Sequence, residues 1–152
     1  MSDRFEILDR SVDHADALAM IAGSEAELSG IYRPEHRNAF SPQELIDAGV
    51  TFLVCYHDGR PVGCGGVAPL DGYAELKRIY VADALRGRGV GARIVAALED
   101  RARAAGFRLM CLETGLASPD ALALYEKLGY RHRGAFGSYV ENGSSVFMER
   151  AL

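Results

Sequence analysis

The segment RGRGVG, residues 86–91, places three glycines at alternate positions just before a helical stretch that extends to about Ala105. Gly87, Gly89 and Gly91 lack Cβ atoms, so the chain can turn sharply and a ligand oxygen can reach the backbone amides. The helix that follows adds the positive end of its dipole. Such a loop is suited to binding a phosphate group, although an ordinary glycine-rich turn would have the same composition.

A dinucleotide-binding fold is an alternative interpretation of the same glycines. Residues 87–92 satisfy the pattern G-x-G-x-x-[GA], and Glu113 follows after roughly 20 residues. The loop, however, lies past the middle of the chain, and too few residues follow Glu113 for further βαβ units. The nucleoside-triphosphate loop is absent, because no Lys-Ser or Lys-Thr pair follows the glycines.

Apolar periodicity and turn residues predict the elements that position this loop. Asp58-Gly59 is typical of a tight hairpin turn, because both residues tolerate positive φ angles. Ser41 and Ser118 each precede a proline and are interpreted as helix caps. The expected strands are FEIL, the two arms of TFLVCYHDGRPVGCGGVAPL, YAELKRIYV, RLMCLETG, YRHRGAF and SSVFMERAL. The expected helices cover about residues 14–28, 41–49, 89–105 and 118–129.

In two of these helices the apolar periodicity predicts which side chains point toward the core. In the first, Leu18, Ile21 and Leu28 lie near one face, and Gly23 is a possible break. In the third, the apolar side chains are expected inward and four charged side chains outward. The outward set is Arg93, Glu99, Arg101 and Arg103. The strand, loop, helix and strand around the glycines require a right-handed crossover.

Length and composition limit the classes of function that this chain can have. The chain has 152 residues, 49% of them hydrophobic, so a single domain over residues 1–152 can bury a full core. A net charge of −4 argues against nonspecific nucleic-acid binding. The charged start MSDRFEILDR does not resemble a signal peptide, and no apolar run approaches the ~20 residues that span a bilayer. We therefore expect a soluble, cytoplasmic protein with no membrane or nucleic-acid partner.

Cysteine and histidine do not suggest a metal or a disulfide. Cys55, Cys64 and Cys111 are odd in number and lie in apolar, strand-like runs, so we interpret them as reduced core residues. The four histidines are scattered, without ligand spacing. We expect no metal site.

Two motifs in a defined order carry a family resemblance. ELKRIYV with RGRGVG, followed by ALALYEKLGY, spans Glu75 to Tyr130. This arrangement resembles the GNAT superfamily of acyl-CoA-dependent N-acyltransferases, whose loop follows R/Q-x-x-G-x-G/A. LETG and FGSYVENGSSVFMER further resemble a common bacterial subgroup. The resemblance implies an α/β (α+β) fold: a mixed, mostly antiparallel sheet of about six to seven strands, about four helices and a β-α-β core that binds acetyl-CoA.

The resemblance also implies where acetyl-CoA binds. The amides of residues 86–91 would hold the pyrophosphate, and the main chain of residues 79–81 would pair with the pantetheine arm like an added strand. Arginine side chains near the loop would screen the phosphates or remain solvated. Ser118 stands where many members carry Asn, so its contact with the cofactor is left open. The implied cofactor-binding residues are Ile79, Tyr80, Val81, Arg86, Gly87, Arg88, Gly89, Val90, Gly91 and Ser118.

Tyr125 matches the family tyrosine that protonates the departing thiolate, although its position on an apolar stripe also fits core packing. Acyl transfer needs a neutral amine, so a carboxylate is expected as general base. Glu75 and Glu113 are the candidates. Strand alternation places Glu75 on one face with Lys77, Ile79 and Val81, and a salt bridge is its alternative role. Glu113 ends a buried strand, and its alternative role is to hydrogen-bond loop amides.

The residues that would bind the amine acceptor are the least defined part of the predicted site. Glu25 would hold a cationic amine if the first helix continues past Gly23, and Tyr32 and Tyr139 would line the pocket by analogy with the subgroup. The resemblance implies an N-acetyltransferase acting on a primary amine of a small molecule, and a homodimer is possible. A protein lysine or N-terminal acetyltransferase and a non-catalytic acyl-CoA-binding module are the alternatives.

Overall fold

The computed structural model describes residues 4–32 and 39–152. In these residues seven strands form one sheet in the order β1-β2-β3-β4-β5-β7-β6. Every neighbouring pair is antiparallel except β4 and β5, which are parallel. The strands are β1 (Phe5–Asp9), β2 (Thr51–His57), β3 (Arg60–Pro69), β4 (Ala74–Val81), β5 (Leu109–Gly115), β6 (Arg131–Arg133) and β7 (Ser145–Ala151). The helices are α1 (Ala15–Ile31), α2 (Pro42–Asp47), α3 (Val90–Ala104) and α4 (Pro119–Lys127), with a 3-10 turn η2 (Asp83–Leu85).

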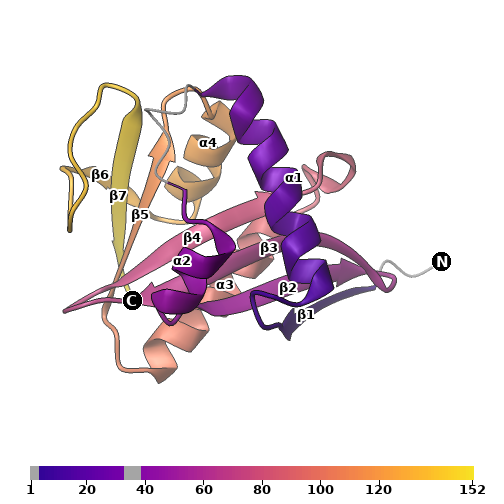
Figure 1. The fold of residues 1–152 in the computed structure, drawn as a ribbon. Coiled ribbons are helices and arrows are strands. Elements are labelled where there is room, and N and C mark those ends of the chain that lie inside the picture. Colours follow the sequence, from indigo (N-terminus) through magenta and orange to yellow (C-terminus); the bar gives the residue numbers. More distant parts are fainter. Residues whose placement is uncertain (1–3, 33–38) are drawn as a thin grey trace.

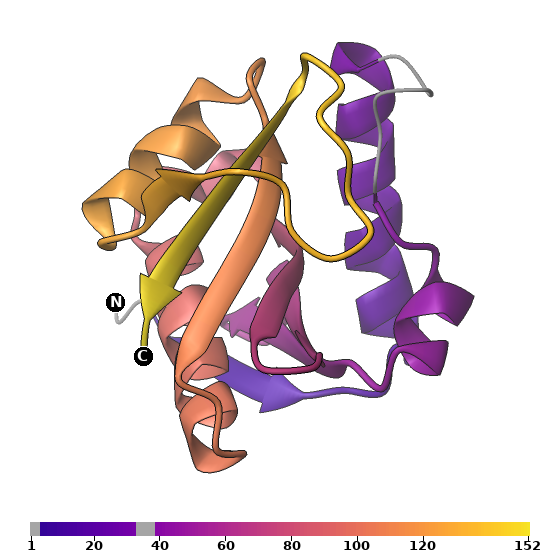
Figure 2. The same ribbon diagram turned by 90° about the vertical axis from the view of Figure 1, so that its left-hand side faces the viewer.

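The sheet separates two layers of helices, with α1 and α2 on one face and α3 and α4 on the other (Figures 1 and 2). Each face has its own apolar core. Ile94, Leu98 and Met110 belong to the core beneath α3, whereas Ile21 and Leu45 belong to the core beneath α1 and α2. This mostly antiparallel mixed sheet with four helices is the expected fold. Both faces are covered, so the central strands are buried on both sides.

Several local predictions are confirmed. Asp58 and Gly59 have φ angles of 50° and 83° in the turn between β2 and β3. Ser41 and Glu44 form the reciprocal hydrogen bonds of a capping box at the start of α2. All three cysteines are free and buried. No helix in the described part of the chain is long and apolar enough to span a bilayer.

Helix α1 continues through Gly23 to Ile31, so the predicted break is wrong. A Cβ atom on Gly23 would lie only 2.9 Å from the hydroxyl oxygen of Tyr80. The glycine therefore permits close approach of β4 to the helix. The predicted inward face is also partly wrong, because Leu18 is 39% exposed. The residues of α1 that are buried are Ala17, Ile21 and Ser24.

Glu99 of α3 is buried, contrary to the outward position that helical periodicity predicts. Arg150 donates hydrogen bonds to both of its carboxylate oxygens at 2.8 Å, and the Tyr130 hydroxyl donates another at 2.8 Å. A carboxylate can be buried when it is paired and hydrogen-bonded in this way. The network ties α3 to β7 and to the end of α4.

We expect Glu99→Leu to lower the free energy of unfolding by about 2–3 kcal/mol, because the buried Tyr130 hydroxyl and the Arg150 guanidinium lose their acceptor. Urea denaturation measures the change. Asp100→Ala is the control: the ion pair of Asp100 with Arg103 is exposed, so its loss should change stability by less than about 0.5 kcal/mol. Equal stability of the two variants would contradict a structural role for Glu99.

Candidate active site

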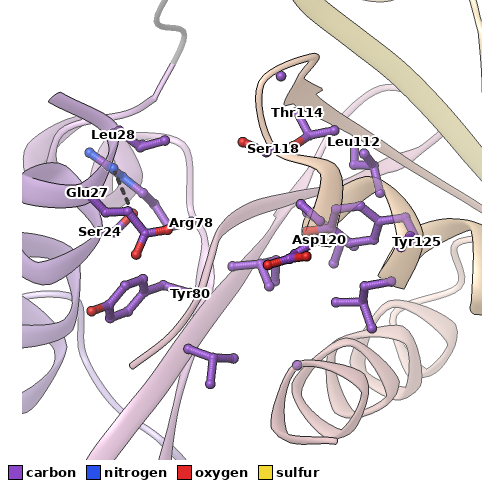
Figure 3. A pocket seen from close by; sticks show the side chains of 18 of the residues that line it. Ser24, Glu27, Leu28, Arg78, Tyr80, Leu112, Thr114, Ser118, Asp120 and Tyr125 are labelled. Carbon is purple, nitrogen blue, oxygen red and sulfur yellow. Dashed lines mark hydrogen bonds between the residues drawn. The ribbon is translucent and has the colours of Figure 1, made fainter. Parts of the chain in front are cut away.

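Strands β4 and β5 separate partway along their length. Their described residues pair only at Ala74 with Met110 and at Glu75 with Cys111. Beyond these pairs the two strands diverge, and a cavity of about 850 Å³ opens between them. Helix α1 lies on one side of this cavity, and β5 with α4 lies on the other (Figure 3). Its size is in the range of small-molecule and cofactor sites.

A β-bulge at Arg78 changes which side chains of β4 face each layer. The register with β3 shifts between the pairs Gly66–Lys77 and Cys64–Tyr80, and Arg78 has a φ of 57°. Ile79 and Val81 pack into the core beneath α3, whereas Tyr80 packs into the core beneath α1. The predicted common face of Glu75, Lys77, Ile79 and Val81 is therefore wrong, because the extra residue reverses the alternation.

The side chain of Arg78 fixes α1 against the bulge. It is 3% exposed, donates to the Phe40 carbonyl at 2.9 Å and pairs with Glu25. It also contacts the Ser24 hydroxyl at 3.5 Å (Figure 3). These contacts hold a non-glycine residue in a backbone conformation that is otherwise disfavoured. Glu25 is directed to Arg78 and is not among the residues that line the cavity. The structure therefore gives Glu25 a partner other than the predicted amine.

The glycine loop presents backbone amides to the cavity. Gly87 and Gly89 have φ angles of 79° and 78°, which glycine adopts without strain. The first hydrogen bond of α3 runs from the Arg93 amide to the Gly89 carbonyl. Within the described residues, the amides of Gly87, Gly89, Val90 and Gly91 have no hydrogen-bond acceptor, and all four residues line the cavity. This is the arrangement that binds phosphate at a helix N-terminus.

The three arginines near the loop differ in position. Arg86 lines the cavity and pairs with Glu27 and Asp83. Arg88 and Arg93 do not line it; their guanidinium carbons lie 5.6 and 4.9 Å from the centroid of the Phe5 ring. Of the three, Arg86 is thus the one placed beside the cavity.

Tyr125 projects from α4 into the cavity (Figure 3). The residue is 6% exposed, and its ring packs edge-on against Tyr130 with centroids 5.8 Å apart. Its hydroxyl makes no hydrogen bond to any other described residue. Burial raises the pKa of Tyr125, so the phenol stays protonated at neutral pH. A buried hydroxyl without a protein partner is available to a ligand.

Ser118 is the N-cap residue of α4, as predicted, but its side chain makes no capping hydrogen bond. Its hydroxyl is instead hydrogen-bonded to the Tyr32 hydroxyl at 2.7 Å. Tyr32 reaches this position because Gly115 has no side chain: a Cβ atom there would lie 1.9 Å from the Tyr32 hydroxyl oxygen. The end of α1 is therefore linked to the start of α4 across the cavity.

Glu75, Lys77 and Tyr139 form a closed triangle of polar atoms in the cavity wall. The Lys77 ammonium donates to Glu75 at 2.9 Å and to the Tyr139 hydroxyl at 2.7 Å, and that hydroxyl donates to Glu75 at 2.5 Å. The side chains of Glu75 and Lys77 are only 4% and 7% exposed. Burial, followed by the charge of Glu75, raises the pKa of Tyr139. The proposed salt-bridge role of Glu75 with Lys77 is thus observed.

Glu113 is the second candidate carboxylate. It is half-buried on β5 and accepts a hydrogen bond from the Ser145 hydroxyl at 2.7 Å. Its charge adds to that of Glu75 in raising the pKa of Tyr139, so the two carboxylates act on the same part of the cavity. Tyr139 itself is held by ring contacts with Phe136 and Phe147, whose centroids lie 5.1 and 5.6 Å away.

Most of the residues predicted for the site lie around this cavity. The exceptions are Arg88 and Glu25. Sequence reasoning assigned no role to Phe40 or to Arg78. No sequence feature pointed to Phe40. The β-bulge at Arg78 cannot be predicted from the strand pattern. The predicted residues that line the cavity are Glu75, Ile79, Tyr80, Val81, Arg86, Gly87, Gly89, Val90, Gly91, Glu113, Ser118, Tyr125, Tyr32 and Tyr139.

The sequence profile of the acetyltransferase (GNAT) family matches residues 17–130. The chain belongs to this family. It is 40% identical over 128 residues to a protein named IAA acetyltransferase from Azospirillum brasilense, covering 82% of this chain and 83% of the relative. An acyl-CoA N-acyltransferase structure from Klebsiella pneumoniae is 33% identical, with a TM-score of 0.83 and 97% of each chain covered.

A further solved structure shares this fold. The PaiA N-acetyltransferase of Thermoplasma acidophilum, in complex with coenzyme A, has a TM-score of 0.78 at 20% identity and covers 98% of this chain and 99% of its own. At this identity the likeness shows the fold alone. The protein is an acyltransferase of the N-acetyltransferase type. Among residues 4–32 and 39–152, no three His, Cys, Asp or Glu side chains form a group that could hold a metal ion.

Proposed function

We propose that the protein transfers the acetyl group of acetyl-CoA to a primary amine of a small molecule, by direct attack in a ternary complex. The observation that carries the proposal is the buried, unpartnered hydroxyl of Tyr125, which lies in the cavity that the glycine loop also lines. A phenol that can donate a proton and a loop suited to anions therefore line the same cavity, which supports the proposal. Acyl transfer from a thioester of a phosphorylated cofactor is helped by both groups.

The residues present fit acetyl-CoA. The main chain of residues 79–81 lies on the part of β4 that does not pair with β5, so its amide and carbonyl groups are suited to an extended pantetheine arm. The free amides of Gly87, Gly89, Val90 and Gly91 are suited to its pyrophosphate. Acetyl-CoA supplies the activated acetyl group, and these protein groups bind and orient it.

The amine needs to lose a proton before it attacks, and we assign the base role to Glu113. The Glu75 carboxylate already accepts hydrogen bonds from Lys77 and Tyr139, so it is committed to holding them. Glu113 is less buried than Glu75, and its carboxylate accepts a hydrogen bond from the Ser145 hydroxyl. A carboxylate that acts directly or through water returns the amine to its neutral, nucleophilic form.

The neutral amine then adds to the thioester carbonyl, and a backbone amide near Val81 stabilises the oxyanion. As the carbon–sulfur bond breaks, Tyr125 protonates the thiolate, and the products are the amide and CoA. The nitrogen that has added to the carbonyl loses its extra proton to water, and the Tyr125 phenolate regains a proton from water. No covalent enzyme intermediate is required. Burial raises the pKa of Cys64 to about 12, which opposes a nucleophilic thiolate there. Help from a general acid typically contributes about 10²–10⁴ in rate.

The test measures CoA-thiol release from acetyl-CoA with polyamines, amino acids, aminoglycosides, aromatic amines and lysine peptides. IAA is included because the relative from Azospirillum brasilense is named for it. Thermal stabilisation by acetyl-CoA, with NAD as the control ligand, measures cofactor binding separately. Release that depends on a small amine and falls in Tyr125→Phe supports the proposal. Release with lysine peptides alone indicates a protein acetyltransferase. Stabilisation by acetyl-CoA without release from any acceptor contradicts catalysis and indicates an acyl-CoA-binding module.

A further inference from the structure

We propose that Tyr130 is a positioning residue for the reaction: together with Glu99 and Arg150 it fixes the ring of Tyr125, and so the place of the Tyr125 hydroxyl in the cavity. This inference rests on the proposed function, in which that hydroxyl is the proton donor. Tyr130, Glu99 and Arg150 are not among the residues that line the cavity, so they act on the reaction through Tyr125. Three observations carry the proposal: a backbone link, a ring contact and an anchored hydroxyl.

The end of α4 joins the main chains of Tyr125 and Tyr130. The amide of Tyr130 donates to the carbonyl of Tyr125 at 2.9 Å, and the amide of Gly129 donates to the carbonyl of Glu126 at 3.1 Å. Gly129 has a φ of 94°. These are the two hydrogen bonds of a Schellman motif, in which a left-handed residue, usually glycine, follows the helix. The motif holds Tyr130 beside the last turn of α4, which carries Tyr125.

The rings of the two tyrosines pack edge-on. Their centroids lie 5.8 Å apart, and their planes make an angle of 68°. Tyr125 and Tyr130 are both buried in the core beneath α3. Edge-to-face contacts between aromatic rings favour particular orientations. Because the Tyr125 hydroxyl makes no hydrogen bond to any other described residue, the contacts of its ring set the place of its oxygen.

The ring of Tyr130 is in turn fixed through its own hydroxyl. That hydroxyl donates to Glu99 of α3 at 2.8 Å, and Arg150 of β7 donates to both oxygens of Glu99 at 2.8 Å. Burial, followed by the hydrogen bond to Glu99, raises the pKa of Tyr130, so its hydroxyl remains a donor at neutral pH. A phenylalanine would fill the same apolar space without a directional bond. A buried polar network whose members are all satisfied specifies one arrangement of the side chains around it.

Proton donation to the departing thiolate is sensitive to this arrangement. The donor oxygen must come within about 2.6–3.2 Å of the atom that receives the proton. A displacement of about 1 Å can lower a rate by about 10²-fold. The binding of acetyl-CoA by the glycine loop does not depend on the Tyr125 hydroxyl. Loosening Tyr130 should therefore lower kcat and leave the Kd for acetyl-CoA unchanged.

Tyr130→Phe and Tyr130→Leu separate the role of the hydroxyl from that of the ring. Turnover is measured with acetyl-CoA and the amine of the release panel that reacts fastest, and calorimetry gives the Kd for acetyl-CoA. We expect kcat to fall about threefold to tenfold in Tyr130→Phe and further in Tyr130→Leu, by no more than in Tyr125→Phe. The Kd should change by less than about twofold in both. Urea denaturation shows whether each variant is folded.

A double-mutant cycle distinguishes positioning from a general contribution to stability. Because Tyr130 acts through the Tyr125 hydroxyl, Tyr130→Phe should change kcat by less than about twofold in the Tyr125→Phe background. A merely structural role would lower kcat by the same factor in both backgrounds. Non-additive effects on kcat are therefore the expected result.

Tyr56→Phe is the matched control. The Tyr56 hydroxyl also belongs to a network of tyrosine, carboxylate and arginine, since it donates to Asp16 at 2.6 Å and accepts from Arg10 at 2.9 Å. Tyr56, however, lies in the core beneath α1 and α2 and does not line the cavity. This variant loses a comparable buried hydrogen bond, so its kcat should be unchanged if only the contact with Tyr125 matters.

Fluorine NMR of the protein labelled with 3-fluorotyrosine gives a readout that does not need turnover. The chain has seven tyrosines, and the signal that disappears in Tyr125→Phe assigns the Tyr125 ring. Tyr130→Phe keeps the neighbouring ring but releases it from Glu99. We expect the Tyr125 signal to shift or broaden in this variant and to stay in place in Tyr56→Phe.

The proposal is overturned if Tyr130→Phe leaves kcat unchanged, lowers it equally in both backgrounds, or has no more effect than Tyr56→Phe. The proposed function fails in a different way, through the absence of CoA release with any amine or through normal turnover in Tyr125→Phe. A shifted Tyr125 signal in Tyr130→Phe would then support the fixing of the ring and contradict its part in transfer, whereas an unchanged signal would contradict both.

Discussion

Tyr125→Phe is expected to lower kcat roughly tenfold to thousandfold while leaving the Kd for acetyl-CoA unchanged. The substitution removes a hydroxyl that makes no hydrogen bond to any other described residue, so the fold loses little. The ring and its edge-on contact with Tyr130 remain. A thiolate is a fair leaving group without help, which is why some activity should persist. Steady-state kinetics and calorimetric titration with acetyl-CoA measure the two quantities.

The pH dependence gives this prediction a second readout. Because burial raises the pKa of Tyr125, the phenol keeps its proton from about pH 6 to 9. The factor by which Tyr125→Phe lowers kcat should therefore be similar across this range. Tyr73→Phe is the matched control, since Tyr73 packs on Phe136 and does not line the cavity. Unchanged turnover in Tyr125→Phe would remove this residue from the mechanism.

Gly91→Val is expected to weaken acetyl-CoA binding by at least about tenfold, or roughly 1.4 kcal/mol. A Cβ atom at this position would lie 3.0 Å from a methyl carbon of Leu124 and 3.7 Å from one of Val81. The two further methyl groups of valine would add to this tight contact, so we expect the start of α3 and the loop before it to shift. The affinity for CoA, measured by calorimetry, tests the prediction.

Gly30→Val is the control for this substitution. Gly30 lies in α1, and no atom lies within 4 Å of the position that its Cβ would occupy. CoA affinity should be unchanged in this variant, and urea denaturation shows whether each variant is folded. A folded Gly91→Val protein with normal CoA affinity would mean that the phosphates do not bind at this loop.

The short-range features of the protein were predictable because they depend on neighbouring residues. Asp58-Gly59 adopts its turn through its own backbone preferences, and Ser41 and Glu44 cap α2 across three residues. The apolar runs around the cysteines predicted buried strands. The motifs from Glu75 to Tyr130 indicated the family, and the family profile that matches residues 17–130 confirms it.

The errors arose where a long-range partner overrides a local preference. Helical periodicity placed Glu99 outward, but Arg150, which is 51 residues away, makes its burial favourable. The bulge at Arg78 reverses the alternation of β4 because contacts with α1 and Phe40 hold its backbone. Ser118 lies at the predicted N-cap position of α4, but its hydroxyl bonds to Tyr32 and makes no capping hydrogen bond.

By itself the sequence determined the family, the order of the elements and the glycine loop, since these depend on local conformation and on motif spacing. Only the tertiary structure decided how the charges of the cavity are paired. Glu75 and Tyr139 are 64 residues apart, and Tyr32 and Ser118 are 86 residues apart. Side-chain partners at such separations depend on how the sheet and helices pack, because burial without a partner is costly and each polar group takes the partner that packing brings within reach.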